Sequence, residues 1–340
     1  MVAGIPAVAE VLDELVPRQA PALLIHSGAH SPTQYGQQLA AATRVLDHEV
    51  IEFVSATNTA ASVAAVAGEI AVVEPGVVVG VGGGRVVDVA KLAAARSGVD
   101  FISVPTQASS DGICSPIAVI VSEQGKPQSL GARIPVGIVA DMDALASAPM
   151  PTWRSGLGDL VSNVSAVRDW RHAHELEGEA IDDFACLTSE AAALSVVEDD
   201  ADLGDAEYRR KLIRGLILSG IAMEMAGSSR PASGSEHLIS QALDELLERP
   251  HLHGLQVALG TIAAFLLRGD DCGRLIRFYR RVGLPITPAD LGVDVSVFIE
   301  AIRRAPRTRP GRWTWLADVS AQALAELEGR YRSGVVGDSA

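Results

Sequence analysis

The chain has 340 residues, enough for about two domains of ordinary size. It is 48% hydrophobic, 21% charged and only 4% aromatic, a balance typical of helices packed on a buried parallel sheet and not of a β-sandwich. Its formal net charge of −14 argues against a nucleic-acid backbone or an anionic membrane as the main partner.

The cysteines and the N-terminus indicate the compartment. There are three cysteines without a CxxC pair, which excludes a disulfide scaffold and a zinc ribbon and favours a reducing environment. The first fifteen residues lack the basic leader and apolar segment of a signal peptide, and no apolar run is long enough for membrane insertion. We therefore expect a cytoplasmic protein.

In chain order, the first half alternates short apolar runs with helical patterns. The apolar runs, which predict strands, are residues 22–26, 50–54, 76–80 and 101–104. The helical patterns between them are residues 33–46, 59–70 and 86–96. Such alternation predicts βαβ units on a parallel sheet with right-handed crossovers.

After about residue 149 the strand-like runs stop. Helical periodicity then covers residues 158–175, 180–197, 208–226, 235–247 and 256–267. The segment PMPTWRSG (149–156) carries two prolines and a glycine and marks a domain boundary. The sequence thus predicts an α/β domain over residues 1–150 and an all-α domain over residues 151–340.

Three consecutive glycines, Gly82, Gly83 and Gly84, follow one predicted strand and precede a helix. Glycine lets the backbone approach a phosphate closely, and the helix start supplies free N–H groups and a positive dipole end. The spacing fits neither GxGxxG nor a P-loop, so an unliganded tight turn is the alternative. The entropic cost of three glycines favours a phosphate site.

A polar loop, PTQASSDG, leaves the next predicted strand at the same edge of the sheet. Open α/β sheets bind ligands at this edge, so Thr106 and Ser109 could hold a ribose or phosphate. Asp111 could accept a hydrogen bond from a substrate hydroxyl. The alternative is that the same side chains only cap turns of the loop.

The helical half contains a candidate metal set. Asp159, His237 and His253 each follow a glycine- or serine-rich helix start, so we expect all three to project from first helical turns toward one point. One carboxylate and two imidazoles suit a divalent metal with an open position. The remaining histidines are expected to be packing or surface residues: His26, His30, His48, His172, His174 and His251.

Six motifs occur in one order: GVGGGRVVDVAKLAA, FISVPTQASSDGICSP, PVGIVADMDALASAP, GLGDLVSNVSAVRDW, SRPASGSEHLISQALD and HGLQVALGT. In these the chain resembles the glycerol-1-phosphate dehydrogenases, which belong to the superfamily of iron-containing alcohol dehydrogenases and dehydroquinate synthases. The resemblance runs from about residue 72 to residue 261. It implies a dehydroquinate synthase-like fold, with an α/β dinucleotide-binding domain followed by an all-α metal- and substrate-binding domain.

The resemblance also implies roles for individual residues. The positions that match cofactor contacts are Gly82, Gly83, Gly84, Asp88, Thr106, Ser109 and Ser115. Those that match metal ligands are Asp159, His237 and His253, for zinc or alternatively nickel or iron. Asp111 and Asp159 match positions at the reacting substrate, and Gln241 matches another position on the substrate side.

The chain departs from the family pattern at four positions. Gln107 and Ser110 replace the alanine and histidine of PTAASHDG, Gln241 replaces a usual histidine, and Leu255 replaces a usual glutamate. Three of the four lie near the expected substrate pocket. The side chains that could replace a missing phosphate donor are Lys91 and Arg230, each of which could instead make a helix-face or ion-pair contact.

The expected activity is metal-dependent hydride transfer from NADH or NADPH to dihydroxyacetone phosphate. The product would be sn-glycerol 1-phosphate, a precursor in phospholipid biosynthesis. The alternatives are a reductase of a different hydroxy-ketone in specialised biosynthesis, a cyclase like dehydroquinate synthase, and an inactive cofactor-binding homologue.

Two further properties stay open. The predicted strand 50–54 ends with neither an acid nor an arginine nearby, which predicts use of both NAD and NADP. The high apolar fraction is compatible with a homodimer.

Overall fold

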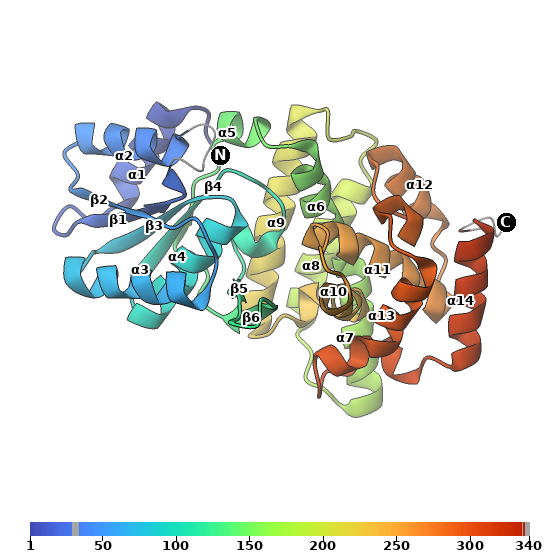
Figure 1. Ribbon diagram of the computed structural model, residues 1–340. Coiled ribbons are helices and arrows are strands. Elements are labelled where there is room, and N and C mark those ends of the chain that lie inside the picture. The colour runs from blue at the N-terminus through green and yellow to red at the C-terminus, as the bar shows by residue number, and fades with distance from the viewer. Residues whose placement is uncertain (29–33, 335, 337–340) are drawn as a thin grey trace. The chain divides into compact units, whose positions relative to one another are not determined.

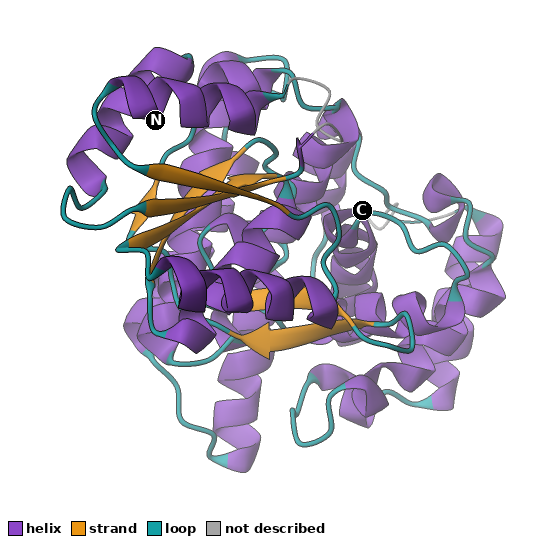
Figure 2. Cartoon of the chain, turned by 60° about the vertical axis from the view of Figure 1, so that its left-hand side comes forward, coloured by secondary structure: helices purple, strands orange, loops and turns teal. Residues whose placement is uncertain are grey.

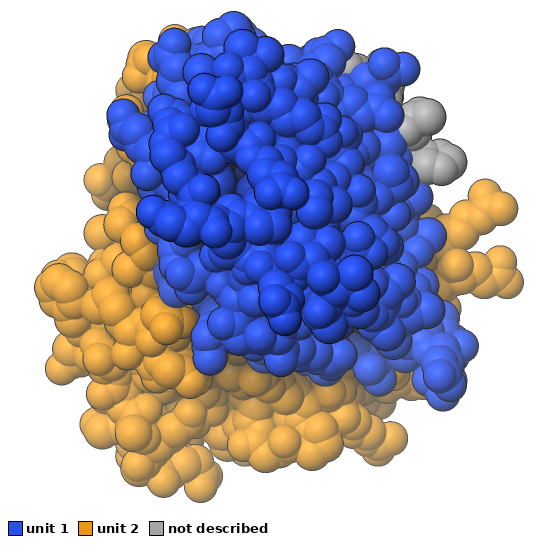
Figure 3. All heavy atoms as spheres, turned by 90° about the vertical axis from the view of Figure 1, so that its left-hand side faces the viewer, with its two compact units in different colours: residues 1–152 blue, residues 153–340 orange. Residues whose placement is uncertain are grey.

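The computed structural model describes residues 1–28, 34–334 and 336, so His30 lies outside the described residues. The chain forms two compact units, Met1–Thr152 and Trp153–Ala340. Figure 1 labels their elements and Figure 3 colours the units separately. The division falls inside helix α6, Met150–Val161, so the proline-containing boundary segment is helical and not a loop.

The first unit is built on a parallel sheet, whose strands are orange in Figure 2. It has five strands in the order β2-β1-β3-β4-β7. Every pair in it is parallel, which confirms the predicted sheet. The strands are β1 Ala22–His26, β2 Val50–Val54, β3 Val77–Gly82, β4 Asp100–Pro105 and β7 Gly137–Ile138. The helices are α1 Ile5–Leu15, α2 Tyr35–Val45, α3 Ala60–Val73, α4 Gly84–Ser97 and α5 Met142–Ala146.

Side-chain alternation along the strands builds two cores. Leu24 packs on one face with residues of α1 and α2, while its neighbours Leu23 and Ile25 pack on the other face with α3 and α4. Strand β3 is buried along its whole length, as its valine-rich sequence predicts for a strand covered on both faces. Because β3 pairs in parallel with β4, their carboxyl ends lie next to each other, with Gly82 paired to Pro105.

A β-hairpin interrupts the α/β alternation after β4. Strand β5, Ile117–Val121, pairs antiparallel with β6, Pro127–Gly131, in a separate two-stranded sheet. The sequence pattern does not predict this hairpin, because β6 is mostly exposed and carries no apolar face. Hairpin and α4 are joined by the bond from the Val119 N–H to the Asp88 carboxylate, at 3.2 Å.

The second unit contains helices and no strand among its described residues, as predicted. Its helices after α6 are α7 Asn163–Glu177, α8 Asp183–Val197, α9 Ala206–Ala226, α10 Ser235–Leu246, α11 His253–Arg268, α12 Gly273–Val282, α13 Val295–Thr308 and α14 Ala321–Ser333. The prediction of one helix over residues 158–175 is wrong, because the helix is interrupted at Ser162, between α6 and α7. The described part of the chain contains no helix with both the length and the apolar character that a membrane crossing needs.

Candidate functional site

Three helices of the second unit bring one carboxylate and two imidazoles together. Asp159 lies on α6, His237 on α10 and His253 on α11, and their ligand atoms all lie within 4.8 Å of one another. Asp159 Oδ1 is 3.5 Å from His237 Nε2 and 3.6 Å from His253 Nε2. Both rings thus direct the same nitrogen toward one carboxylate oxygen.

The expectation that all three residues begin helices is wrong for Asp159. His253 is the first residue of α11 and His237 lies in the first turn of α10, but Asp159 is the third residue from the end of α6. What places its side chain beside the histidines is therefore the crossing of α6 with α11 and not a helix start.

Glycines allow the helix backbones to touch beside the ligands. A methyl group on Gly158, next to Asp159, would lie 2.3 Å from the carbonyl oxygen of Gly254, next to His253. A methyl group on Gly254 would lie 1.8 Å from the carbonyl oxygen of Ser155. Real Cβ atoms do not approach so closely, so only glycine permits this crossing.

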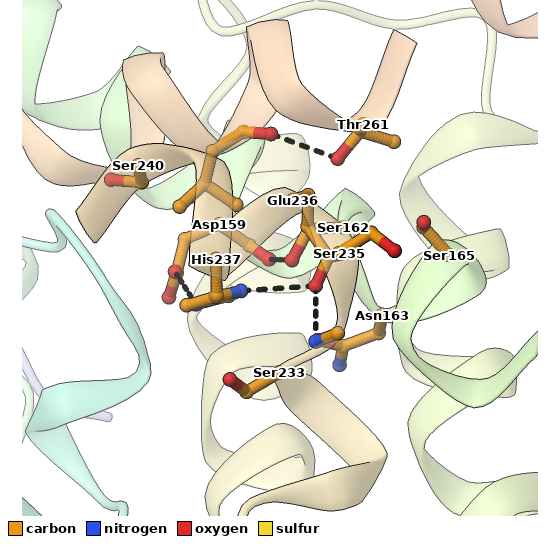
Figure 4. A network of polar contacts seen from close by, with 12 residues as sticks. Asp159, Ser162, Asn163, Ser165, Ser233, Ser235, Glu236, His237, Ser240 and Thr261 are labelled. Atoms are coloured by element: carbon orange, nitrogen blue, oxygen red, sulfur yellow. Dashed lines mark hydrogen bonds and ion pairs between the residues drawn. The ribbon is translucent and has the colours of Figure 1, made fainter. Parts of the chain in front are cut away.

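Each histidine is held at its other ring nitrogen. His237 Nδ1 lies 3.1 Å from Oε1 of Glu236, and Figure 4 shows His237 bonded on one side to Asp159 and on the other to Glu236. His253 Nδ1 lies 3.3 Å from the hydroxyl of Ser240. In the neutral ring, a proton donated from Nδ1 leaves Nε2 unprotonated and able to bind a metal, the arrangement that carboxylate–histidine–metal sites use.

Glu236 is a site residue that the sequence analysis missed. Its side chain is fully buried, and Oε1 also accepts the Gly234 N–H at 2.6 Å. Burial alone would raise the pKa of Glu236, but the hydrogen bond and charge of His237 keep it below its ordinary value. The signal was visible as an acid directly before His237 in SGSEH.

The two histidines differ in charge when no metal is bound. Burial would lower the pKa of His237, but Asp159 and Glu236 outweigh it and raise this pKa to about 9. The pKa of His253 is lowered to about 4, because surrounding protein excludes water from the ring and His237 carries positive charge. At pH 7 His237 therefore holds a proton and His253 does not, although 44% of the His253 side chain is exposed.

This donor set fits a divalent transition metal. Two imidazole nitrogens and one carboxylate oxygen are the ligands of open zinc sites and of other first-row ions, and they leave a further position for substrate. Among the described residues, no second group of three such side chains has its ligand atoms gathered in this way.

The glycine turn of the first unit connects β3 to α4. Gly82 ends the strand, Gly83 precedes the helix and Gly84 is its first residue. None of the three has a positive φ, so their backbone conformation does not require glycine. What can require glycine here is the lack of room for a side chain. A methyl group on Gly82 would lie 2.9 Å from Cβ of Val86, whereas one on Gly84 would meet nothing nearer than 3.9 Å.

The polar loop after β4 lies beside this turn. The Thr106 N–H donates to the Gly82 carbonyl at 2.9 Å, and the Ser109 hydroxyl is the atom 3.9 Å from the Cβ position of Gly84. Gln107, a departure from the family pattern, reaches within 2.9 Å of the Cβ position of Gly83. The structure therefore brings Thr106 and Ser109 to the glycine turn, and Gln107 with them.

Part of the loop makes internal bonds. The Ser110 hydroxyl accepts the Gly112 N–H at 3.3 Å and so caps the short 3₁₀ helix Asp111–Ile113. Asp111 is partly exposed at the start of this helix. This cap is made by Ser110, which is not one of the side chains for which capping is the alternative.

Two predicted cofactor contacts, Asp88 and Ser115, are engaged in bonds within the first unit. Ser115 is buried, and its carbonyl oxygen accepts from Lys91 Nζ at 3.0 Å. Lys91 also donates to the Gly112 carbonyl at 2.8 Å and lies 3.4 Å from Asp88. Burial raises the pKa of Asp88 despite the nearby ammonium group. Lys91 is consequently engaged inside the first unit and is not a free phosphate donor.

Gln241 and Leu255, two departures from the family pattern, lie on the helices that carry the two histidines. Gln241 follows His237 by four residues on α10, which puts both on one helix face, and Leu255 follows His253 by two on α11. Both are partly exposed. Arg230, the other candidate phosphate donor, is buried and paired with Glu179, its Nε lying 2.6 Å from Oε1.

A cavity of about 440 Å³ in the first unit lies against the end of β4, with Thr106 in its wall. Its polar side includes Tyr35, whose hydroxyl donates to Asp141 Oδ2 at 2.6 Å. Burial and the Asp141 carboxylate raise the pKa of Tyr35, so this hydroxyl stays protonated.

A parallel α/β unit, a helical unit and an Asp–His–His set together define the class of metal-dependent dehydrogenases with the dehydroquinate synthase-like fold. The family described as iron-containing alcohol dehydrogenase matches residues 3–149. A probable glycerol dehydrogenase from Sinorhizobium meliloti superposes with a TM-score of 0.74 at 25% identity, over 97% of this chain and 96% of that one.

Closer relatives narrow the class. The chain is 40% identical to an NAD(P)-dependent glycerol-1-phosphate dehydrogenase of Hyperthermus butylicus, over 96% of this chain and 95% of the relative. It is 46% identical to the corresponding enzyme of Thermococcus kodakarensis over 77% of this chain and 75% of the relative. The chain belongs to the glycerol-1-phosphate dehydrogenase family.

Proposed function

We propose that the protein reduces dihydroxyacetone phosphate to sn-glycerol 1-phosphate with NADH or NADPH, using one bound divalent metal. The observation that carries the proposal is the convergence of Asp159, His237 and His253 within 4.8 Å of one another. The relatives named above act as NAD(P)-dependent glycerol-1-phosphate dehydrogenases, which supports the cofactor and the substrate.

In the proposed mechanism the residues of the second unit hold and orient the metal. When bound, the metal acts as a Lewis acid on the substrate carbonyl. Glu236 and Ser240 keep the Nε2 atoms of the two histidines available by accepting hydrogen bonds at Nδ1. Asp159 neutralises part of the positive charge and, in this proposal, also borders the substrate.

The first unit is proposed to bind the dinucleotide. Its pyrophosphate would lie on Gly82–Gly84 at the start of α4, where backbone N–H groups have no helical partner. Thr106 and Ser109 would contact the cofactor beside this turn, and Asp111 would accept a hydrogen bond from a substrate hydroxyl. Asp88 and Ser115 would act from within the unit, by holding the loop and the hairpin in place.

Five finer statements belong to the same proposal. The metal is zinc, with nickel or iron as the alternatives. NADH and NADPH both serve, because β2 ends without an acid that would select one of them. The enzyme works in the cytoplasm as a homodimer and supplies phospholipid biosynthesis.

The test is nicotinamide absorbance during incubation of the purified protein with dihydroxyacetone phosphate. The protein is first stripped with a chelator and then tested with and without added zinc, nickel or iron. The proposal predicts loss of reduced nicotinamide only when substrate and metal are both present. Consumption that is independent of metal would contradict it, as would no consumption with any of the three metals.

A second candidate is the reduction of a different hydroxy-ketone. Gln241, one helical turn from His237, favours it because an amide replaces the family's usual imidazole at this position. Gln241→His separates the two candidates. If dihydroxyacetone phosphate is the substrate, this variant keeps a similar kcat/KM. A gain of about tenfold or more would show that the native pocket is built for another ketone.

A further inference from the structure

Three arginines of the second unit gather around the segment that precedes α10. Arg309 Nη1 donates to the Ser229 hydroxyl at 3.0 Å, and Arg312 Nη2 donates to the same hydroxyl at 3.0 Å. Arg230 follows Ser229 directly and donates to the Trp313 carbonyl at 2.6 Å, so that its guanidinium adjoins the stretch that carries Arg309 and Arg312. We call Arg230, Arg309 and Arg312 the arginine cluster.

The arginine cluster has more positive charge than its surroundings balance. Glu179 pairs with Arg230 through both carboxylate oxygens. Among the described residues, the hydrogen bonds of the Arg309 and Arg312 guanidinium groups go to a serine hydroxyl and a backbone carbonyl, not to a carboxylate. Burial and the charges of Arg309 and Arg230 lower the pKa of Arg312 to about 9, although the charges of Glu179 and Glu236 act in the opposite direction. Burial and Arg230 lower the pKa of Arg309. Like charges held together at partly buried positions favour the binding of an anion.

The segment that carries the cluster also carries a metal ligand. Arg312 Nη1 donates to the Ser233 carbonyl at 2.6 Å, and His237 follows Ser233 by four residues, a stretch of at most about 14 Å even if fully extended. Asp169 fastens the two stretches together, accepting the Ser235 N–H at 2.6 Å and the Trp315 N–H at 3.2 Å. The cluster and the metal set are thus held by one piece of backbone.

We propose that Arg309 and Arg312, supported by Arg230, bind the phosphate group of the substrate. This inference rests on the proposed function, in which the substrate is a phosphorylated ketone. In dihydroxyacetone phosphate the phosphate is attached to the carbon next to the carbonyl, so the two groups must be bound close together. Guanidinium groups match phosphate oxygens in charge and in hydrogen-bond geometry. Arg309 and Arg312 are partly exposed, whereas Arg230 is buried and orients the cluster from behind.

The alternative is that the arginines have a structural role only, linking the chain after α13 to Ser229 and Ser233 in the segment before α10. Under this alternative, substitution would lower the unfolding temperature and leave phosphate affinity unchanged. Measuring both quantities on the metal-loaded protein separates the two explanations.

The test compares Arg309→Gln and Arg312→Gln with Arg307→Gln. Arg307 is an exposed arginine in the last turn of α13, directly before the cluster residues, and serves as the control. Titration of inorganic phosphate measures anion binding without turnover. We expect the wild type and Arg307→Gln to bind phosphate alike and the two cluster variants to bind it about tenfold or more weakly, the loss of a charge-assisted hydrogen bond. No phosphate binding by the wild type, or equal binding by all four proteins, would overturn the proposal.

Steady-state kinetics show whether the cluster binds the phosphate of the substrate or that of the cofactor. The cluster variants should raise KM for dihydroxyacetone phosphate and leave KM for unphosphorylated dihydroxyacetone, NADH and NADPH unchanged. A rise in KM for NADPH alone would assign the cluster to the cofactor and overturn the proposal. If the wild type reduces no ketone, the proposed function fails, while the phosphate titration still decides whether the cluster binds the anion.

Discussion

Glycines serve opposite purposes in the two units. In the second unit, Gly158 and Gly254 let α6 and α11 touch, because a methyl group would lie 2.3 Å or 1.8 Å from a carbonyl oxygen. In the first unit, the start of α4 is open at Gly84, where the nearest atom to an added methyl group is 3.9 Å away. Gly158 and Gly254 bring two helices into contact beside Asp159 and His253, whereas Gly84 leaves open space at a helix start, where we propose that the cofactor binds.

Gly254→Ala should have the largest effect, because it breaks the close contact of α6 with α11 in the second unit. Its methyl group would overlap the Ser155 carbonyl, so α6 and α11 must move apart and the free energy of unfolding should fall by about 3 kcal/mol or more. Metal binding should be lost as well, because Asp159 and His253 lie beside the crossing. Denaturant unfolding and metal content measure the two effects.

The matched control is Gly329→Ala in α14, where a methyl group would meet nothing within 4 Å. It should stabilise the protein by up to about 1 kcal/mol through helix propensity. If Gly254→Ala behaves like this control, the account of the crossing is wrong.

Substitutions of Glu236 test whether metal binding requires the hydrogen bond that orients the His237 ring. Glu236→Ala removes the acceptor at His237 Nδ1 and should weaken metal binding about 10- to 100-fold, while Glu236→Gln keeps an acceptor and should weaken it less. Competition with a chromogenic chelator measures the affinity. Glu248→Gln, an exposed position after α10, serves as the control. Equal affinities in all three variants would remove Glu236 from the site.

The pH dependence of metal affinity also tests the environment of His237. The pKa of His237 is raised to about 9 without metal, so its proton stabilises the metal-free protein below its ordinary pKa and this contribution disappears as pH rises toward 9. A metal must displace that proton, so between pH 8 and pH 6 apparent metal affinity should fall roughly a hundredfold. His253, with a pKa of about 4, should release no proton in this range.

Calorimetry in buffers of different ionisation enthalpy counts the released protons. Release of one proton per metal at pH 7 agrees with the account. Release of two, or of none, would contradict the different environments of the two histidines.

Gly84→Ala should have the smallest effect on folding. Its φ is ordinary and its Cβ position is open, so the free energy of unfolding should change by less than about 1 kcal/mol. NADH affinity should nevertheless fall about tenfold if the pyrophosphate lies on this turn. Fluorescence titration of NADH checks this, and unchanged affinity would remove Gly84 from the cofactor site.

The sequence predicted what local pattern determines. The four predicted strands are confirmed because buried parallel strands read as continuous apolar runs, as β3 does. The hairpin β5–β6 was missed because β6 has no apolar face, and the break at Ser162 was missed because helical periodicity continues across it. Helices α12 to α14 were not predicted individually.

The site shows the same limit. Asp159, His237 and His253 could be named as candidates from residue type and motif. The crossing at Gly158 and Gly254 could not, because a methyl clash depends on which helices meet. The arginine cluster could not be predicted either, because Arg309 and Arg312 are far along the chain from Arg230. Their bonds to the neighbouring Ser229 span 80 and 83 positions.

The most direct test of the central claim is the metal content of purified protein. We would compare the wild type with Asp159→Asn and with Asp270→Asn, an acid outside the set that instead pairs with Arg168 and Arg268. The account predicts one divalent metal per chain in the wild type and in Asp270→Asn, and none in Asp159→Asn. Full metal content in Asp159→Asn, or no metal in the wild type after incubation with zinc, nickel and iron, would contradict it.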